Sequence, residues 1–379
     1  MKIIHLSDLH IGKRLKEISL YEDQNYILAG ILKAVDDEKP DAVIIAGDVY
    51  DKSVPSAEAV ALFDSFLSDL AKRGLKVFII SGNHDSPERT AFGYEIFEAA
   101  GVYISPVYNG EIKPVTLSDE YGEVNFWLLP FIKPAHVRAA IPGAEINSYT
   151  DAVRTALEKA QPDTAKRNVL VTHQFVTGAR TSDSEEVTVG GTDNVDAAVF
   201  DGFDYVALGH LHSPQSCGRD TVRYCGTPLK YSFSEENDEK SITVVTLGAK
   251  GDVNIGIIPL KPLRDMKTLK GKYADIMQLD FYGNTTYRED YVRIILTDED
   301  EIPDAVKKLR TVYRNITELS YDNRVSRRLF EESGAGSVKS KSPLELFAEF
   351  FEAQRGIPLS EFQQETVRSI IEESEEESV

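Results

Sequence analysis

The chain has few of the residues that stabilise small secreted proteins or membrane spans. Its 379 residues include two cysteines, Cys217 and Cys225, which are too few for a disulfide framework and favour a reducing cytoplasm. No apolar run approaches the roughly 20 residues needed to cross a bilayer. The N-terminal stretch enters a strand pattern with polar residues at once, so no secretory signal is expected. The sequence therefore indicates a cytoplasmic globular protein with two inert thiols.

Positive charge is also scarce. The 42 Lys and Arg residues stand against 62 Asp and Glu residues, which gives a formal net charge of −20 and disfavours nucleic-acid binding at first sight. The charge is unevenly spread, however, because residues 331–379 hold 12 acidic and 4 basic residues. Basic side chains gather instead in residues 261–272 and 303–314. Contact between these basic stretches and DNA therefore remains open, beside the alternative that they are solvated faces.

The first 260 residues alternate strand-like and helical patterns. Six apolar runs have the pattern of buried strands, at residues 2–8, 41–48, 76–83, 124–131, 168–175 and 204–211. Helices are expected over residues 57–73, after the N-cap Ser56, and over 88–100. This alternation indicates an α/β sheet covered by helices. Two later runs, 240–249 and 253–260, follow each other without a helix and should add antiparallel strands.

At this length two or three domains are expected, because a single core rarely grows so large. Residues 1–260 would form the main domain, and 263–325 a second unit with a strand at 291–297 and a helix from Pro303 to Arg314. Residues 326–341 have the composition of a linker. Residues 342–372 should form two short amphipathic helices, the second starting at Ser360 and Gln363. They are too short to bury their apolar stripe alone, so they either fold back or dock on a partner.

Chemistry-bearing side chains follow the ends of these strands. Parallel strands end at one edge of a sheet, so residues far apart in sequence should converge there. His210 and His212 lie two apart, and alternate residues of a strand point to one side, so both imidazoles can face one point, as at a metal site. Glycines 47, 82 and 209 precede candidate ligands, where the backbone must bend or approach a phosphate. The candidate ligands form a mixed oxygen and nitrogen set suited to two divalent ions: Asp8, His10, Asp48, Asn83, His173, His210 and His212.

The series resembles a known family. Asp-x-His at 8–10, Gly-Asp-x-x-Asp at 47–51, Gly-Asn-His-Asp at 82–85, a lone His173 and Gly-His-x-His at 209–212 are similar to the motifs of calcineurin-like metallophosphoesterases. The flanks of these motifs, residues 223–235 and the tail resemble the SbcD nuclease subfamily, so the likeness covers nearly the whole chain. It implies an α/β fold with a β-sandwich core flanked by helices, a small DNA-capping domain, and C-terminal helices that bind an SbcC-type, SMC-like ATPase.

The resemblance also implies roles for single residues. Asp8, His10, Asp48 and His212 would hold one metal ion, and Asp48, Asn83, His173 and His210 the other. The ions would most simply be Mn²⁺. His84 would be the acid that protonates the leaving oxygen, oriented by Asp85. Asp51 would lie behind the ligands or position DNA.

Simpler interpretations stand beside these roles. His5 is expected in the core and His136 on the surface of a helix. Several cations near the motifs would contact phosphates or merely be solvated, with equal weight: Lys13, Arg14, Lys52, Arg89 and Arg180.

The function implied is a nuclease of DNA repair, recombination and replication that works with its ATPase partner as a homodimer within a heterotetramer. It would act on duplex ends as a 3′–5′ exonuclease, and on hairpins and single strands as an endonuclease. One alternative is a phosphoesterase for nucleotides or phosphoproteins, which would share all the metal motifs. Another is a non-catalytic DNA-tethering scaffold, which would be expected to lack some ligands, whereas every one is present here.

Overall fold

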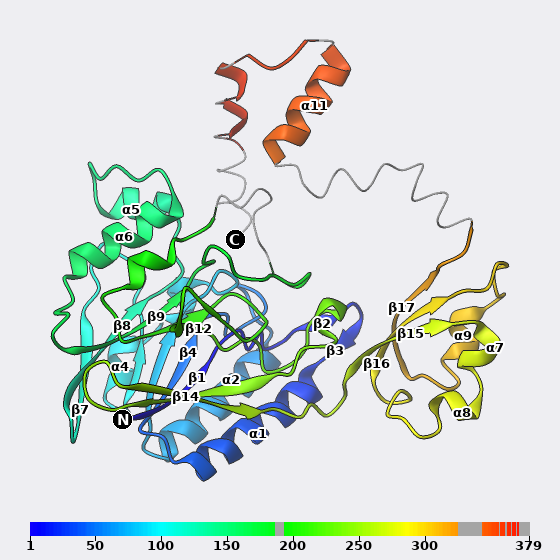
Figure 1. Ribbon diagram of the computed structural model, residues 1–379, viewed down its shortest axis with the longest axis horizontal. Coiled ribbons are helices and arrows are strands. Elements are labelled where there is room, and N and C mark those ends of the chain that lie inside the picture. The colour runs from blue at the N-terminus through cyan, green and yellow to red at the C-terminus, as the bar shows by residue number, and fades with distance from the viewer. Residues whose placement is uncertain are drawn as a thin grey trace.

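Two six-stranded sheets pack face to face in the main body of the protein (Figure 1). The structure is a computed structural model that describes residues 1–185, 193–324, 343–355, 357–360, 362–364, 366–368 and 370. The first sheet has the order β14 (Val253–Pro259), β13 (Ser241–Leu247), β1 (Lys2–Leu6), β4 (Ala42–Ala46), β5 (Lys76–Ile80) and β6 (Val102–Ile104). The second has the order β11 (Gln215–Cys217), β12 (Arg219–Tyr224), β10 (Tyr205–Gly209), β9 (Arg167–His173), β8 (Gly122–Leu129) and β7 (Pro114–Asp119). The expected sandwich is confirmed.

Each sheet has a parallel centre. Strands β1, β4, β5 and β6 run parallel, as do β8, β9, β10 and β12, while β13 and β14 are antiparallel to each other. The six apolar runs expected to be strands are β1, β4, β5, β8, β9 and β10, which are confirmed. The carboxyl ends of the parallel strands in both sheets therefore supply one common edge for a site.

Helices cover the outer faces of both sheets. Helices α1 (Tyr21–Glu38) and α2 (Ala57–Lys72) pack apolar side chains on the first sheet. Helices α5 (Pro134–Ala140) and α6 (Tyr149–Ala160) cover the second sheet. A third apolar cluster fills the space between the two sheets. Because the central strands are buried on both faces, their sequences are continuously apolar rather than alternating.

The prediction of one continuous helix over residues 88–100 is wrong. The segment forms two short helices, α3 (Pro87–Thr90) and α4 (Tyr94–Glu98). Gly93 lies between them with φ +71°, a left-handed conformation that interrupts a right-handed helix. The break leaves Phe92 and Ile96 exposed, with relative solvent accessibilities of 81% and 79%. The expected helix after Ser56 is confirmed, with the Ser56 hydroxyl accepting from the Ala59 amide at 3.2 Å.

The second unit is built on a three-stranded parallel sheet of β15 (Met266–Gly271), β16 (Tyr291–Leu296) and β17 (Asn315–Tyr321). Helices α7 (Tyr273–Ile276), α8 (Leu279–Tyr282) and α9 (Ala305–Leu309) complete it. The helix expected from Pro303 to Arg314 is shorter than expected. Asp304 adopts φ +53°, so the helix starts after it, and the amides of Thr311 and Val312 bond to carbonyls three residues back, which tightens the chain into turns.

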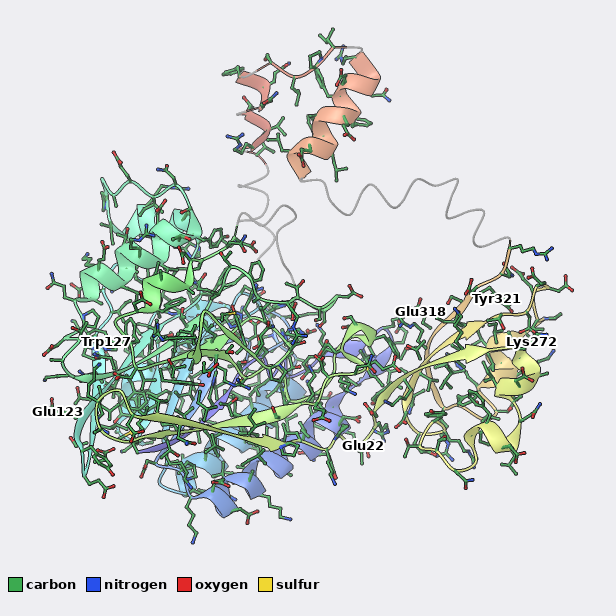
Figure 2. The ribbon with its side chains drawn as sticks, viewed as in Figure 1. Glu22, Glu123, Trp127, Lys272, Glu318 and Tyr321 are labelled. Carbon is green, nitrogen blue, oxygen red and sulfur yellow. The ribbon has the colours of Figure 1, made fainter. Side chains whose placement is uncertain are left out.

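The second unit is tied to α1 by a buried polar contact. Asp23 accepts a hydrogen bond from the Tyr291 hydroxyl at 2.6 Å and forms an ion pair with Arg264 at 2.7 Å. Glu22, which lies between the main body and the second unit in Figure 2, also accepts from Arg264. An apolar cluster that includes Leu20 and Met266 surrounds these groups. These contacts join the second unit to α1, the helix that lies beside the Asp8–His10 motif.

Two helical segments lie near the C-terminus. Helix α11 (Pro343–Arg355) is the first of the two expected helices, while Ser342 and the expected linker at 326–341 lie outside the described residues. Ser360 and Gln363 form the expected reciprocal cap, with the Ser360 amide donating to Gln363 Oε1 at 3.0 Å. Among the residues that the structure describes, no helix is both long and apolar enough to cross a bilayer. Cys217 and Cys225 are free, buried thiols.

The two sheets meet where β10 passes the end of β4. A Cβ atom on Gly209 would overlap the carbonyl oxygen of Ala46 and lie 2.6 Å from His173 Nδ1. Similarly, a Cβ on Gly82 would overlap the Asp48 side chain. At these two positions a glycine is needed because other protein atoms pack closely against it. From the sequence, the expected reason was a bend of the backbone or the approach of a phosphate.

Replacing Gly209 with alanine should therefore destabilise the fold. We expect Gly209→Ala to lower the free energy of unfolding by about 1–3 kcal/mol or more, because the added methyl group forces the sheets apart. Urea denaturation followed by circular dichroism measures the change. Gly30→Ala is the matched control, since Gly30 lies in α1 with no atom within 4 Å of the added Cβ. It should stabilise by about 0.5–1 kcal/mol. Equal effects of the two variants would contradict the packing argument.

Candidate metal centre

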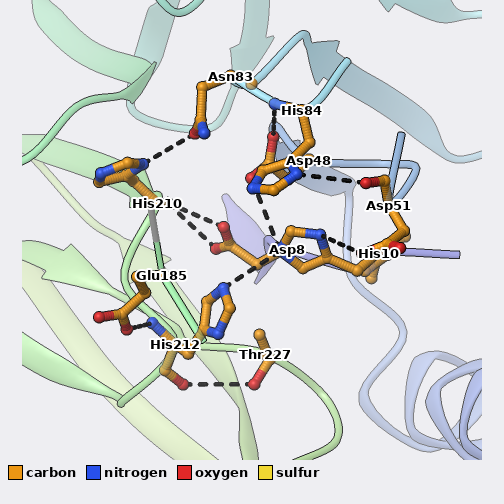
Figure 3. A network of polar contacts seen from close by, with 12 residues as sticks. Asp8, His10, Asp48, Asp51, Asn83, His84, Glu185, His210, His212 and Thr227 are labelled. Atoms are coloured by element: carbon orange, nitrogen blue, oxygen red, sulfur yellow. Dashed lines mark hydrogen bonds and ion pairs between the residues drawn. The ribbon is translucent and has the colours of Figure 1, made fainter. Parts of the chain in front are cut away.

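The seven expected ligand side chains converge at the carboxyl ends of the strands of both sheets, and Figure 3 labels all of them except His173. Ligand atoms of three sets of residues lie within 4.8 Å of one another. The sets are Asp8, His10 and His212; His10, Asp48 and His84; and Asp8, Asp48 and His173. Asn83 joins them through its amide oxygen, which lies 2.9 Å from His210 Nδ1 and 3.0 Å from His173 Nε2. The convergence expected from the strand ends is therefore present.

The backbone at this edge is held in unusual conformations. Asp8, His10, Asp48 and His210 have φ values of +52°, +42°, +48° and +104°, in the left-handed half of conformational space that non-glycine residues rarely adopt. Such conformations cost free energy and persist where surrounding contacts over-determine them. Here the amides of Asp8 and His10 donate to the carbonyls of Gly47 and Asp48 at 3.0 and 2.9 Å. The turns thus aim the side chains at one centre.

One half of the centre brings two imidazole rings face to edge. His10 Nε2 and His212 Nε2 lie 3.1 Å apart, and the Asp48 carboxylate lies 3.6 Å from His10 Nε2. Two ring nitrogens at this distance can share one proton or jointly bind one cation. Both rings are buried, and burial pushes the pKa of His10 well below its ordinary value. A buried pair of nitrogens beside a carboxylate fits a divalent cation.

The other half gathers on Asn83 and Asp48. His173 Nε2 lies 3.3 Å from the Asp48 carboxylate, and the Asn83 oxygen lies between His173 and His210. Burial lowers the pKa of His210 to about 3, with a further lowering by the charge of His173, so at neutral pH the ring is neutral and one of its two nitrogens carries no proton and can bind a cation. An oxygen that faces a neutral ring nitrogen is better satisfied by a cation between them. Asp48 faces both halves.

His210 and His212 do not face one point, so the expectation from strand alternation is wrong. Strand β10 ends at Gly209, and the φ of +104° at His210 turns its ring away from the direction that a strand would give it. The His210 ring meets Asn83, whereas the His212 ring meets His10. The two histidines therefore belong to the two different halves of the centre.

The electrostatics of the cluster are those of a site built for positive charge. Asp8 and Asp48 are 0% and 2% exposed. Burial raises the pKa of Asp8. Burial would also raise the pKa of Asp48, but the charge of His173 and its hydrogen bond hold it well below the ordinary value. Burial opposes the charge of His173, yet Asp48 and then Asp8 raise its pKa to about 9. Buried carboxylates gain most from paired positive charge.

His84 stands beside this cluster and is held by the loop of Asp51. Its backbone amide donates to Asp48 Oδ1 at 2.9 Å, and its Nδ1 lies 3.2 Å from the Asp51 carbonyl oxygen. The expected contact of its ring with Asp85 is wrong. The Asp85 carboxylate instead accepts from three backbone amides, those of Val49, Tyr50 and Gly82, at 3.0–3.1 Å. Asp85 therefore holds the β4 and β5 loops together, because those amides have no other partner within a sheet.

Sequence reasoning missed the groups behind His212. Its Nδ1 lies 2.6 Å from the Ser184 hydroxyl, which also contacts the Glu235 carboxylate at 2.5 Å. Lys240 forms a buried ion pair with Glu235 at 2.6 Å. Burial would raise the pKa of Glu235, but its contacts with His212 and Lys240 hold it well below the ordinary value. Glu235 ends the 223–235 segment, where only the family resemblance offered a signal.

Other singled-out residues occupy plain positions. His5 is buried and its Nδ1 lies 2.8 Å from the Tyr205 hydroxyl, so it is the expected core histidine. His136 is the exposed third residue of α5. Asp51 lies 3.8 Å from His10 Nδ1 and forms an ion pair with Lys13 at 2.7 Å. Arg14 donates to the Glu17 carbonyl oxygen, and the remaining cations are exposed: Lys52, Arg89 and Arg180.

Comparisons with known proteins show the family to which the chain belongs. Residues 1–214 match the family model described as calcineurin-like phosphoesterase, and residues 262–355 match one described as type 5 capsule protein repressor C-terminal domain. The chain belongs to the calcineurin-like phosphoesterases, a family of metal-dependent hydrolases.

Within that family the chain is of the SbcD type. It is 37% identical over 324 residues to the SbcD subunit of the nuclease SbcCD from Staphylococcus epidermidis, and the match covers 84% of this chain and 85% of the relative. This confirms the resemblance seen in the sequence.

Two solved structures are similar to the chain at low identity. A dimetal phosphatase from Danio rerio is 11% identical, covers 69% of this chain and 98% of its own, and has a TM-score of 0.42. The protein TT1561 of Thermus thermophilus is 14% identical, covers 68% of this chain and 98% of its own, and has a TM-score of 0.38. Both TM-scores lie below 0.5, so neither likeness bears on the residues of the site.

The loop that carries Asp8 and His10 is supported by two residues that the sequence did not single out. Gln24 of α1 donates from Nε2 to the His10 carbonyl at 2.7 Å and accepts from the Gly12 amide at 2.9 Å. The Tyr231 hydroxyl donates to the Leu9 carbonyl at 2.5 Å. Both side chains are nearly fully buried. They hold the strained turn from the side of the second unit.

Gln24→Leu should loosen this turn. The variant leaves the Gly12 amide without its partner, at about 1–3 kcal/mol in the free energy of unfolding, and leaves the His10 carbonyl with the Lys13 amide as its remaining donor. We also expect the dissociation constants for divalent ions, measured by calorimetry, to rise. Gln278→Leu is the matched control, because Gln278 is exposed and its side chain caps nothing. Unchanged metal affinity in Gln24→Leu would contradict a positioning role.

Proposed function

We propose that this chain is the nuclease subunit of an SbcCD-type complex and hydrolyses phosphodiester bonds of DNA with two divalent ions, most simply Mn²⁺. The observation that carries the proposal is the convergence of candidate ligand atoms in three overlapping groups, two of which contain Asp48, in a chain of SbcD type. The substrates are duplex ends, degraded 3′–5′, and hairpins or single strands, cut internally. The work belongs to DNA repair, recombination and replication in the cytoplasm of the cell.

The ligands divide into two sets that share Asp48. Asp8, His10 and His212 join Asp48 in one set, supported by the 3.1 Å approach of the two imidazoles. Asn83, His173 and His210 join it in the other, supported by the position of the Asn83 oxygen. Two divalent ions in such a site neutralise the non-bridging oxygens of a phosphodiester and make water available as a nucleophile near neutral pH.

The chain's own residues then orient the substrate and move one proton. His84 Nδ1 faces a carbonyl oxygen, which only accepts, so Nδ1 carries a proton. With Nδ1 donating to this carbonyl, Nε2 is the ring nitrogen left for the substrate, and we propose that the doubly protonated ring donates its Nε2–H to the leaving oxygen, so that His84 acts as the acid. Asp51 fixes this ring through its backbone and faces His10 with its side chain. Asp85 keeps the loop of Asn83 and His84 in place through the backbone amides.

The second unit supports DNA rather than a small phosphoester as substrate, although its charges are arranged differently from the sequence expectation. Arg264, Lys267, Lys270 and Arg314 form ion pairs with Asp23, Asp265, Asp322 and Glu289. Within the described part of the chain, no ion pair is recorded for Lys307, Lys308 or Arg310 on and beside α9. We therefore assign the DNA contact of the capping unit, residues 263–325, to α9. A phosphoesterase for nucleotides or phosphoproteins would not need it.

A homodimer is part of the proposal. Phe92, Ile96 and Phe97 form an exposed apolar patch on α4 and the turn before it, close in sequence to Asn83 and His84. A twofold axis through one patch places the same residues opposite each other, which is how isologous dimers bury apolar surface. The patch therefore offers a place for the second copy.

The role of His84 is tested by His84→Asn. We expect the cleavage rate of end-labelled duplex and hairpin DNA in Mn²⁺ to fall by about 10²–10⁴-fold, the usual contribution of a general acid. Calorimetry should still count two bound ions and DNA affinity should be retained, because His84 is not among the ligands. Loss of an ion in this variant would assign His84 to the metal. Absence of Mn²⁺-dependent cleavage by the unaltered chain would refute the proposed function itself.

The tail, residues 342–372, is proposed to bind the SbcC-type ATPase. Phe347 and Phe350 of α11 are 41% and 62% exposed, so these parts of the apolar stripe are not covered by the main body. An amphipathic helix with an open stripe fits the groove or coiled-coil face of a partner.

Phe347→Asp combined with Phe350→Asp should abolish co-purification with that ATPase, while the Mn²⁺-dependent nuclease activity of the isolated subunit persists. Leu279→Asp on α8 is the control, since Leu279 is equally apolar and 67% exposed but lies outside the tail. Full binding of the ATPase by the double variant would overturn the assignment of the tail.

A further inference from the structure

A cavity opens directly beside the metal centre. It has a volume of about 400 Å³ and is bordered by Gly82 and Asn83 on one side and by Phe131 and Lys133 on the other. Asn83 belongs to both, because its oxygen meets His173 and His210 while the residue also borders the cavity. A group in this cavity would therefore lie next to whatever the metal centre holds.

Basic side chains border the cavity, although the protein as a whole is acidic. Arg89, Lys133 and His136 border it, together with the carboxylates of Asp85 and Glu88. The Asp85 carboxylate is buried and accepts from three backbone amides, so it does not face a ligand. Glu88 is exposed and accepts from the Ser86 hydroxyl at 3.0 Å. Two permanent cations therefore outweigh the one exposed acid, which favours an anionic ligand.

One wall of the cavity is apolar and flat. The Phe131 ring is half-buried, lies nearly parallel to the His210 ring at 6.3 Å, and stands edge-on to His173 at 6.2 Å. Val54 and Pro87 also border the cavity. A ligand that suits this lining has an anionic group for the cations and a flat apolar part for the ring, and a volume of this size lies in the range of small-ligand sites.

We propose that this cavity binds the nucleotide that flanks the scissile phosphodiester, with its phosphate on Arg89 and Lys133 and its base against Phe131. The proposal rests on the proposed nuclease function and deepens it, because it names where the substrate strand passes. A nucleic-acid base stacks on an aromatic side chain whatever its identity, so the pocket positions the strand without selecting a sequence.

The test compares two substrates that differ in the flanking nucleotide. Single-stranded oligonucleotide carries it, whereas bis(4-nitrophenyl) phosphate offers a phosphodiester alone. For Arg89→Ala and for Lys133→Ala in the full chain with Mn²⁺, the ratio of kcat/KM for the oligonucleotide to kcat/KM for the small ester should fall about tenfold, the effect of one lost charged contact. Lys33→Ala, an exposed lysine of α1, is the matched control and should keep the ratio of the unaltered chain.

Two further readouts separate phosphate and base contacts. The slope of log affinity against log salt concentration for a single strand should become shallower by about 0.7 with each phosphate contact removed. Phe131→Leu should weaken binding of an intact oligonucleotide, but not of one that is abasic at the flanking position. A ratio that stays unchanged overturns the pocket, and this includes the case in which both substrates lose rate in equal proportion. An unaltered chain that hydrolyses the small ester but no DNA overturns the proposed function instead.

Discussion

The hydrogen bond from His173 Nδ1 to the carbonyl oxygen of Ala46, 2.8 Å long, joins the two sheets at the edge that carries the site. His173 ends β9 of one sheet, and Ala46 ends β4 of the other. Since a carbonyl only accepts, Nδ1 must carry the proton, and Nε2 is left facing Asn83 and Asp48. This one contact thus sets both the approach of the sheets and the orientation of a central ligand. Gly209 makes it possible, because any Cβ there would enter the same space.

The residues around this contact divide the work of holding the turns. The turns after β1 and β4 contain left-handed residues, which would relax if their backbone groups were free. Gln24 and Tyr231 bind the carbonyls of the first turn, and Asp85 binds amides of the second. None of these three side chains is among the proposed ligands, yet each is nearly fully buried. The site is therefore kept in shape by groups one layer behind it, and Asp23 extends that layer to the second unit through Tyr291.

What the sequence could predict follows from how local each signal is. Continuous apolar runs predicted the strands, because burial on both faces leaves a pattern in five or six residues. The strand ends then located the ligands, since topology alone brings them together. The prediction of one helix at 88–100 failed because apolar spacing does not reveal that Gly93 adopts a left-handed backbone conformation. The Asp85 contact failed because adjacency in sequence does not decide between a ring and three backbone amides. Glu235 was missed since its role exists only after the chain folds it behind His212.

The structure also shows where the charges of the protein lie and which of them are paired, which the composition alone does not. A net charge of −20 opposes binding to a polyanion at long range, and most of the basic stretch at 261–272 is neutralised by neighbouring acids. What acts on a phosphate, however, is the potential within about 10 Å, because salt screens the rest. At that range a substrate in the centre would meet the divalent ions that we propose for the buried carboxylates, then Arg89 and Lys133. The acidic excess of the tail lies in a different segment of the chain. Attraction is thus confined to the site and to the basic residues on and beside α9, so an acidic surface elsewhere can discourage non-specific binding while the centre still accepts a DNA strand.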